Sequence, residues 1–149
     1  MSESLLQAPA LTAPAPQAVR FDAARHYEAL CEWWVGHGEE PPPLTHLPLL
    51  GAVVDGLAAG FVYEAPVHGD GPENRATTCF MHELVSNPAA EKRAVNAALD
   101  AVVEALLVSA RARGGLGVAA WTDEVAVVQR ARRHGFLGQG KSFWLARAL

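Results

Sequence analysis

Apolar residues recur every three or four positions in three stretches of the chain, and this spacing predicts three helices. The predicted helices span residues 22–35, 87–113 and 122–134. In chain order, the residues expected to cap their N-termini are Asp22, Asn87 and either Thr122 or Asp123. Pro88 suits the first turn of the second helix, because a proline there removes no helical hydrogen bond. Glycines follow all three stretches, as expected where helices end.

Shorter apolar stretches bounded by turn residues predict strands. The predicted strands are 19–21, 50–54, 57–63, 76–85, 116–121 and 142–146. Asp55-Gly56 predicts a two-residue hairpin turn between the second and third strands. The proline-rich segment 37–48 and the polar segment 65–75 are expected to be loops. The expected order along the chain is β-α-β-β-β-α-β-α-β, which predicts an α/β fold with a mixed central sheet and helices on both faces.

Length and composition fit one domain behind a short tail. The chain has 149 residues, of which 50% are hydrophobic, and a domain of this length buries about two-thirds of its unfolded surface. Residues 1–17 are rich in alanine and proline and are expected to form a flexible tail, which leaves residues 18–149 as the folded domain.

Charge and cysteine usage exclude several classes of function. The formal net charge is −4, which does not favour a nucleic-acid partner. The most apolar stretch, 97–110, is interrupted by Asp100 and Glu104, so neither a membrane span nor a membrane partner is expected. Cys31 and Cys79 stand alone without the spacing of metal ligands. We therefore expect a reduced cytoplasmic protein without a metal site.

Three features carry a resemblance to a known family. The segment HELVSNP (82–88) joins a strand to a long helix, the first turns of that helix follow, and the last helix ends in ARRHGF (131–136). With the order of elements, they make residues 19–149 similar to the GNAT N-acetyltransferase superfamily. The chain looks most like the short GNAT-like proteins of bacteria and their phages.

The resemblance implies an acetyl-coenzyme A site. In the family, the strand before the long helix splays from its neighbour at a bulge, and its free backbone pairs with the pantetheine arm; here Leu84, Val85 and Ser86 occupy that stretch. The N–H of Val85 is the expected donor to the thioester oxygen. The residues that match the family's phosphate loop are Glu91, Lys92, Arg93, Ala94, Val95 and Asn96. Glu91 differs from the neutral or basic residue of the family, and Lys92 and Arg93 are expected to contact phosphate directly.

Acetyl transfer also needs a group that accepts the proton of the amine. Glu83 and His82 are the candidates, directly or through water, and strand alternation places them on opposite faces. The alternative for both is an ordinary strand side chain. Ala131 stands where the family often has a tyrosine that protonates the leaving thiolate. Arg130, Arg132 and Arg133 either bind the adenosine 3′-phosphate or form an exposed helix end.

The sequence therefore predicts an acetyl-coenzyme A-dependent N-acetyltransferase in which an amine of a small molecule or peptide attacks the thioester directly. The alternative is a GNAT-like domain without catalysis that binds coenzyme A or another protein. An assembly protein from a phage is a third interpretation. A homodimer through the final strand is left open, and the acceptor is not identified by any pattern in the chain.

Overall fold

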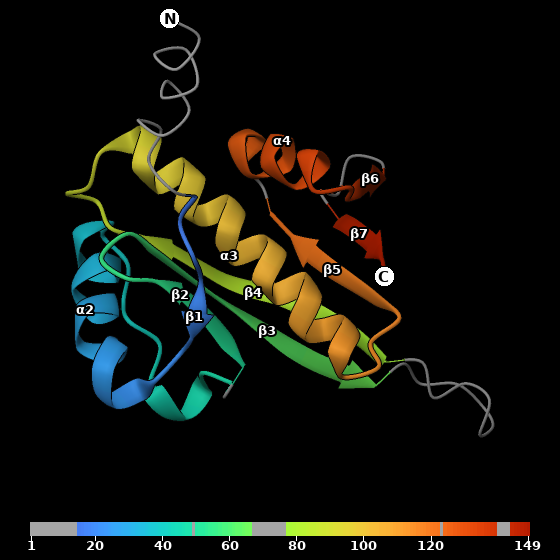
Figure 1. The fold of residues 1–149 in the computed structure, drawn as a ribbon, viewed down its shortest axis with the longest axis horizontal. Helices are drawn as coiled ribbons and strands as arrows, with labels where there is room; N and C mark the ends of the chain where they lie inside the picture. The colour runs from blue at the N-terminus through green and yellow to red at the C-terminus, as the bar shows by residue number, and fades with distance from the viewer. Residues whose placement is uncertain (1–14, 49, 67–76, 123, 140–143) are drawn as a thin grey trace, which may run out of the picture.

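The computed structural model describes residues 15–48, 50–66, 77–122, 124–139 and 144–149. They form one seven-stranded mixed sheet in the order β1-β2-β3-β4-β5-β7-β6. Neighbouring strands are antiparallel except β4 and β5, which run parallel. Figure 1 shows α3 lying along one face of the sheet, with α2 at the other side and α4 beside β5, β6 and β7. The predicted fold class is confirmed.

The strands are β1 (Val19–Arg20), β2 (Gly51–Val54), β3 (Ala58–Pro66), β4 (Thr77–Ser86), β5 (Gly117–Trp121), β6 (Leu137–Gln139) and β7 (Trp144–Ala148). The helices are α2 (Ala23–Gly36), α3 (Lys92–Ala112) and α4 (Val125–Arg133), with a short 3₁₀ turn, η2, at Leu44–His46. The order matches the prediction apart from β6 and η2, which are too short to leave an apolar pattern. None of the helices in the described part of the chain is long and apolar enough to cross a membrane.

The core has two parts, one on each face of the sheet. Strand alternation sends Val53 of β2 toward α2, while its neighbours Ala52 and Val54 face α3. The α2 side is built around Trp33 and Trp34, both buried. The α3 side contains the buried stripe of α3, whose members are Ala98, Val102, Val103, Leu106, Leu107 and Ala110. Helices therefore cover both faces, as predicted.

The start of α3 differs from the prediction. Asn87 does not cap this helix, because α3 begins only at Lys92 and Glu91 makes no side-chain capping bond. Asn87 instead forms a separate turn: its Oδ1 accepts from Ala89 N at 3.0 Å, and its Nδ2 donates to Gly56 O at 2.8 Å. Its amide therefore ties the β4–α3 connection to the β2–β3 hairpin. Other expected ends are confirmed, since Asp22 caps α2 and α3 stops before Gly114, whose φ is 79°.

Three smaller expectations are corrected. The hairpin turn has three residues, because Val54 pairs with Ala58, and only Gly56 has positive φ. β3 runs on to Pro66, so the polar loop starts later than residue 65, and the rest of that expected loop lies outside the described residues. At α4 the N-cap is Glu124, whose N–H donates to Thr122 Oγ1 at 3.1 Å; Asp123 lies outside the described residues.

Candidate functional site

A cleft opens where β4 and β5 separate. The two strands pair only over Thr78–Gly117, Cys79–Val118 and Phe80–Ala119. Beyond Phe80, β4 continues to Ser86 paired with β3 alone. A bulge marks the point of separation. The adjacent residues Phe61 and Val62 of β3 pair with Glu83 and Met81 of β4, so one residue of β4 has no partner on β3. His82 is the extra residue, and such a bulge bends the strand and frees ladder groups.

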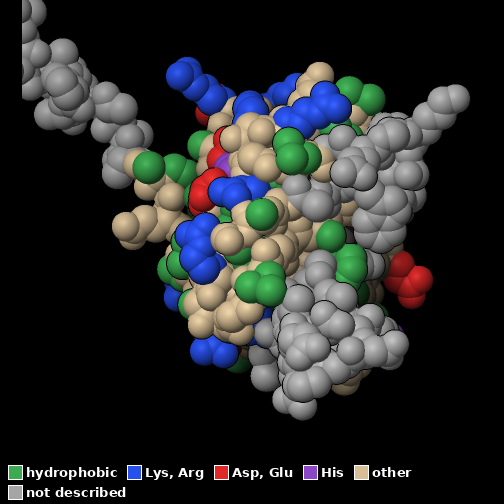
Figure 2. Space-filling model, turned by 90° about the vertical axis from the view of Figure 1, so that its right-hand side faces the viewer, with side chains coloured by type: hydrophobic (Ala, Val, Ile, Leu, Met, Phe, Trp, Pro, Cys, Tyr) green, Lys and Arg blue, Asp and Glu red, His purple; other side chains and the backbone are tan. Residues whose placement is uncertain are grey.

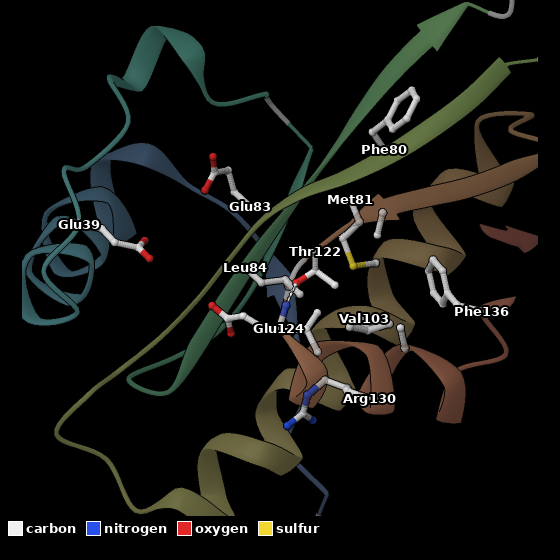
Figure 3. A pocket seen from close by; sticks show the side chains of 13 residues that line it. Glu39, Phe80, Met81, Glu83, Leu84, Val103, Thr122, Glu124, Arg130 and Phe136 are labelled. Carbon is white, nitrogen blue, oxygen red and sulfur yellow. Dashed lines mark hydrogen bonds between the residues drawn. The ribbon is translucent and has the colours of Figure 1, made fainter. Parts of the chain in front are cut away.

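The cavity between these strands has a volume of about 530 Å³. Its walls come from β4, β5, α3, α4 and the segment after α2. The lining residues are Glu39, Phe80, Met81, Glu83, Leu84, Val103, Ala120, Thr122, Glu124, Val127, Arg130, Ala131 and Phe136. Figure 3 shows Glu83 and Glu124 on opposite sides of Leu84 and Thr122. We call this cavity the β4–β5 cleft; its floor is apolar and its charged groups lie toward the sides.

The backbone groups that β4 presents to the cleft follow from its pairing with β3. Asn87 N donates to Leu57 O on the β3 side, so alternation also directs the N–H of Val85 toward β3. The N–H groups of Leu84 and Ser86 then point away from β3. The C=O of Ser86 points the same way, since His37 Nε2 donates to it at 2.8 Å. The donor expected at Val85 is therefore better placed at Leu84, and the Val85 side chain is buried in the core below α2.

Glu83 is the candidate base that the structure brings to the cleft. Its half-buried side chain lines the cavity from the α2 side of the sheet, close enough to Tyr63 to influence that phenol. Burial raises the pKa of Tyr63, and the negative charge of Glu83 raises it further. The expected alternation through His82 and Glu83 is broken by the bulge, so Met81 and Leu84, three residues apart, both pack against the α3 core. The His82 side chain lies outside the described part of the chain.

The six residues matched to a phosphate loop divide into two groups. Glu91, Lys92 and Arg93 are exposed at the N-terminus of α3, where Glu91 O accepts the first helical bond from Val95 N at 3.0 Å. The N–H groups in the first turn of α3 have no partner within the helix, as at any helix start. Ala94, Val95 and Asn96 are half-buried, and Asn96 is engaged by another helix. Their roles toward a cofactor stay predictions.

A polar cluster joins α3 to α4 beside the cleft. Arg130 donates from Nη1 to Asn96 O at 3.0 Å and to Asp100 Oδ1 at 2.7 Å, and from Nη2 to Asn96 Oδ1 at 2.7 Å. His134 places Nε2 2.9 Å from Asp100 Oδ1 and Nδ1 2.6 Å from Glu104 Oε1. We call these five residues, Asn96, Asp100, Glu104, Arg130 and His134, the α3–α4 polar cluster.

Sequence reasoning missed this cluster. It assigned Arg130, Arg132 and Arg133 either to the adenosine 3′-phosphate or to an exposed helix end. Burial raises the pKa of Asp100, but hydrogen bonds from His134 and Arg130 outweigh it and hold the pKa below the ordinary value of 3.8. A usable signal was present, because acids at 100 and 104 match bases at 130 and 134 with the same four-residue spacing.

The remaining arginines of α4 do not reach the cleft walls. Arg132 and Arg133 are exposed, and Arg133 Nη2 lies 3.6 Å from Asp100. Figure 2 views the molecule from the side where α4, β6 and β7 lie and shows Lys and Arg side chains spread over this face with few carboxylates. Ala131 does line the cleft, so a methyl group occupies the wall where the family often has a tyrosine. Within the described residues, no group of three His, Cys, Asp or Glu side chains is arranged to hold a metal ion.

Comparison with known proteins identifies the fold. No family model matches the sequence, and no curated protein is similar enough in sequence to be matched. Among solved structures, a chain of a NatC complex bound to Gag peptide and coenzyme A is 12% identical, with a TM-score of 0.66 over 89% of this chain and 99% of that one. A Trypanosoma brucei acetyltransferase is 14% identical, with a TM-score of 0.63 over 85% and 95%.

A third similar structure is an aminoglycoside 6′-acetyltransferase type Ii, 16% identical, with a TM-score of 0.61 over 88% of this chain and 96% of that one. At this level of identity the likeness concerns the fold. The chain therefore has the GNAT acetyltransferase fold over nearly its whole length.

Proposed function

We propose that this chain is an acetyl-coenzyme A-dependent N-acetyltransferase that moves the acetyl group to an amine by direct attack. The observation that carries the proposal is the separation of β4 from β5 at the His82 bulge, directly before α3. The separation leaves an extended backbone edge on β4 beside a cavity of about 530 Å³, and the N-terminus of α3 follows that strand along the chain. An extended ligand with an anionic end matches these three features in that order.

The residues present fit such a ligand in part. The N–H of Leu84 faces the cleft and can donate to an amide or thioester oxygen. Three exposed residues at the start of α3 carry two positive charges, on Lys92 and Arg93, and one negative charge, on Glu91. The phosphates would therefore be held by side-chain cations and backbone N–H groups, with Glu91 opposing them. When bound, acetyl-coenzyme A supplies the activated acetyl group, and everything else must come from the chain.

Glu83 is the residue that we place in the role of base. A protonated amine has to lose a proton before it can attack, and a carboxylate at the cleft wall can accept it directly or through water. Glu39 and Glu124 line the same cavity, so the cleft is lined by three carboxylates from separate parts of the chain and by one arginine, Arg130. This lining favours a cationic amine over an anionic acceptor. Position 131 is alanine, so no phenol at that position protonates the leaving thiolate.

The alternative, a domain that binds coenzyme A or a protein without catalysis, is favoured by that same alanine. The two functions are separated by measuring acetylated product by mass spectrometry with a panel of polyamines, aminoglycosides and peptide N-termini. The enzyme hypothesis predicts product with at least one amine and a rate about 100-fold lower for Glu83→Gln. The matched control is Glu28→Gln, an exposed carboxylate on α2, which should leave the rate unchanged. Binding of acetyl-coenzyme A without product from any amine would support the alternative.

A further inference from the structure

The attachment of α4 to the rest of the domain is unusual for a helix that forms a wall of the cleft. None of its residues is fully buried. Val128 and Ala131 pack partly against the core, while Val125 is 64% exposed. Apolar burial, which normally dominates helix docking, therefore contributes little here.

Polar contacts hold α4 against α3 instead. Five hydrogen bonds or close charged contacts, from Arg130 and His134, reach across to α3. The two donors are the shielded partners: the Arg130 side chain is 15% exposed and that of His134 is 8% exposed. Charged groups in such positions bind strongly when every contact is made and are costly when one partner is lost.

The His134 ring needs both of its protons for this arrangement. Each ring nitrogen lies within hydrogen-bond distance of a carboxylate oxygen, and a carboxylate can only accept. A neutral ring would turn one lone pair toward a carboxylate and lose that contact. The charged groups around the ring are Asp100 and Glu104 on α3, Arg130 and Arg133 on α4, and Arg147 of β7, whose Nε donates to His134 O at 3.0 Å.

We propose that Asp100 and Glu104 are positioning residues that hold α4, and with it the α4 wall of the β4–β5 cleft, through Arg130 and a doubly protonated His134. Because Arg130, Ala131 and Val127 line the cleft, the position of α4 sets its width. The consequence for cofactor affinity rests on the proposed function, whereas the docking of α4 does not. The cleft should be narrowest when His134 is charged and should loosen as the ring loses a proton.

The docking is tested by hydrogen–deuterium exchange of the α4 amides in the full chain, corrected for the intrinsic rate of each amide at each pH. Asp100→Asn and His134→Gln should raise exchange in α4 about tenfold and should raise it less in the buried turns of α3, which respond only to the change in global stability. Glu104→Gln, at a more exposed partner, should raise it less. Arg133→Gln is the matched control, since it removes an exposed arginine 3.6 Å from the same Asp100, and should change exchange less than about twofold.

The pH profile distinguishes positioning from a general loss of stability. Protection of α4 in the wild type should be lower at about pH 8 than at about pH 5, whereas in His134→Gln it should be the same at both pH values. An equal dependence of α4 protection on pH in both proteins, or unchanged exchange in Asp100→Asn, would overturn the proposal.

Coenzyme A affinity is then titrated in the same variants. If the wild type binds no coenzyme A, the proposed function fails while the docking result stands. If the variants bind coenzyme A as tightly as the wild type, the position of α4 does not set the width of the cleft.

Discussion

Gly60 on β3 is the position where the packing of the cleft can be perturbed most directly. It pairs with Leu84 of β4, and α3 crosses above it. A Cβ added here would lie 2.5 Å from Leu84 Cδ2, 2.7 Å from Val102 Cγ1 and 3.1 Å from Leu106 Cδ1. Gly60→Ala therefore forces both β4 and α3 side chains to move, by roughly 1 Å to reach an ordinary contact distance.

The size of the effect follows from two opposing terms. Overpacking a filled core costs about 1–3 kcal/mol, because side chains leave their preferred rotamers. Replacing a strand glycine by alanine returns about 0.5–1 kcal/mol of chain entropy. We therefore expect Gly60→Ala to lower the free energy of unfolding by about 0–2.5 kcal/mol, centred near 1 kcal/mol. Because Leu84 lines the cleft, the same change should also weaken coenzyme A binding by displacing the free edge of β4.

Gly117→Ala on β5 is the matched control. Among the residues that the structure describes, a Cβ at Gly117 would meet only Arg147 O, at 3.4 Å, which is ordinary contact. It should leave stability unchanged or raise it slightly. Urea unfolding followed by tryptophan fluorescence measures both variants, since Trp33 and Trp34 are buried. Equal midpoints for the two variants would refute the close packing of β3, β4 and α3 around Gly60.

Three further predictions concern single side chains. Glu83→Gln should lower the pKa of Tyr63 toward 10.0, because it removes the negative charge beside the phenol. Ring ¹³C shifts of the two tyrosines measure this, and an unchanged pKa of Tyr63 would show that the charge of Glu83 does not act on the phenol. The pKa of Asp100 is lowered in the folded chain. The ionised carboxylate therefore stabilises the fold above pH 3.8, and this stabilisation is lost as the pH falls through the lowered pKa of the folded state. Asp100→Asn should therefore be about 1 kcal/mol less stable near neutral pH, discounted for a carboxylate side chain that is 40% exposed, and the gap should close in acid; a gap independent of pH would contradict this. Asn87→Ala should cost about 1 kcal/mol in urea unfolding by releasing the β4–α3 connection from Gly56, and no loss would mean that the turn does not depend on this amide.

Much of the fold was predictable because its signals are local. Asp22 marks the start of α2 by its own side chain, and the α3 stripe with its glycine stop was visible as a period in the sequence. Asn87 and Pro88 satisfied the same local rules, yet they form a separate turn. The competing partner of Asn87 is Gly56, which is 31 residues away, so no local rule could find it.

The candidate site was predictable only in outline. The family resemblance pointed to the strand before the long helix, but the direction of each backbone group on it depends on the register with β3 and on the bulge at His82. That register moves the expected donor from Val85 to Leu84. The α3–α4 polar cluster depends on how two helices meet in space. The matching four-residue spacing of its acids and bases indicates a pairing but does not say that these two faces meet.

The central claim, that the β4–β5 cleft and the start of α3 bind acetyl-coenzyme A, is tested most directly by isothermal titration of the full chain with this ligand. The account predicts saturable binding to the wild type, a loss of at least about tenfold in affinity for Arg93→Glu at the start of α3, and unchanged affinity for Arg20→Glu on β1, the far edge of the sheet. No binding at millimolar ligand, or equal weakening in both variants, would contradict it.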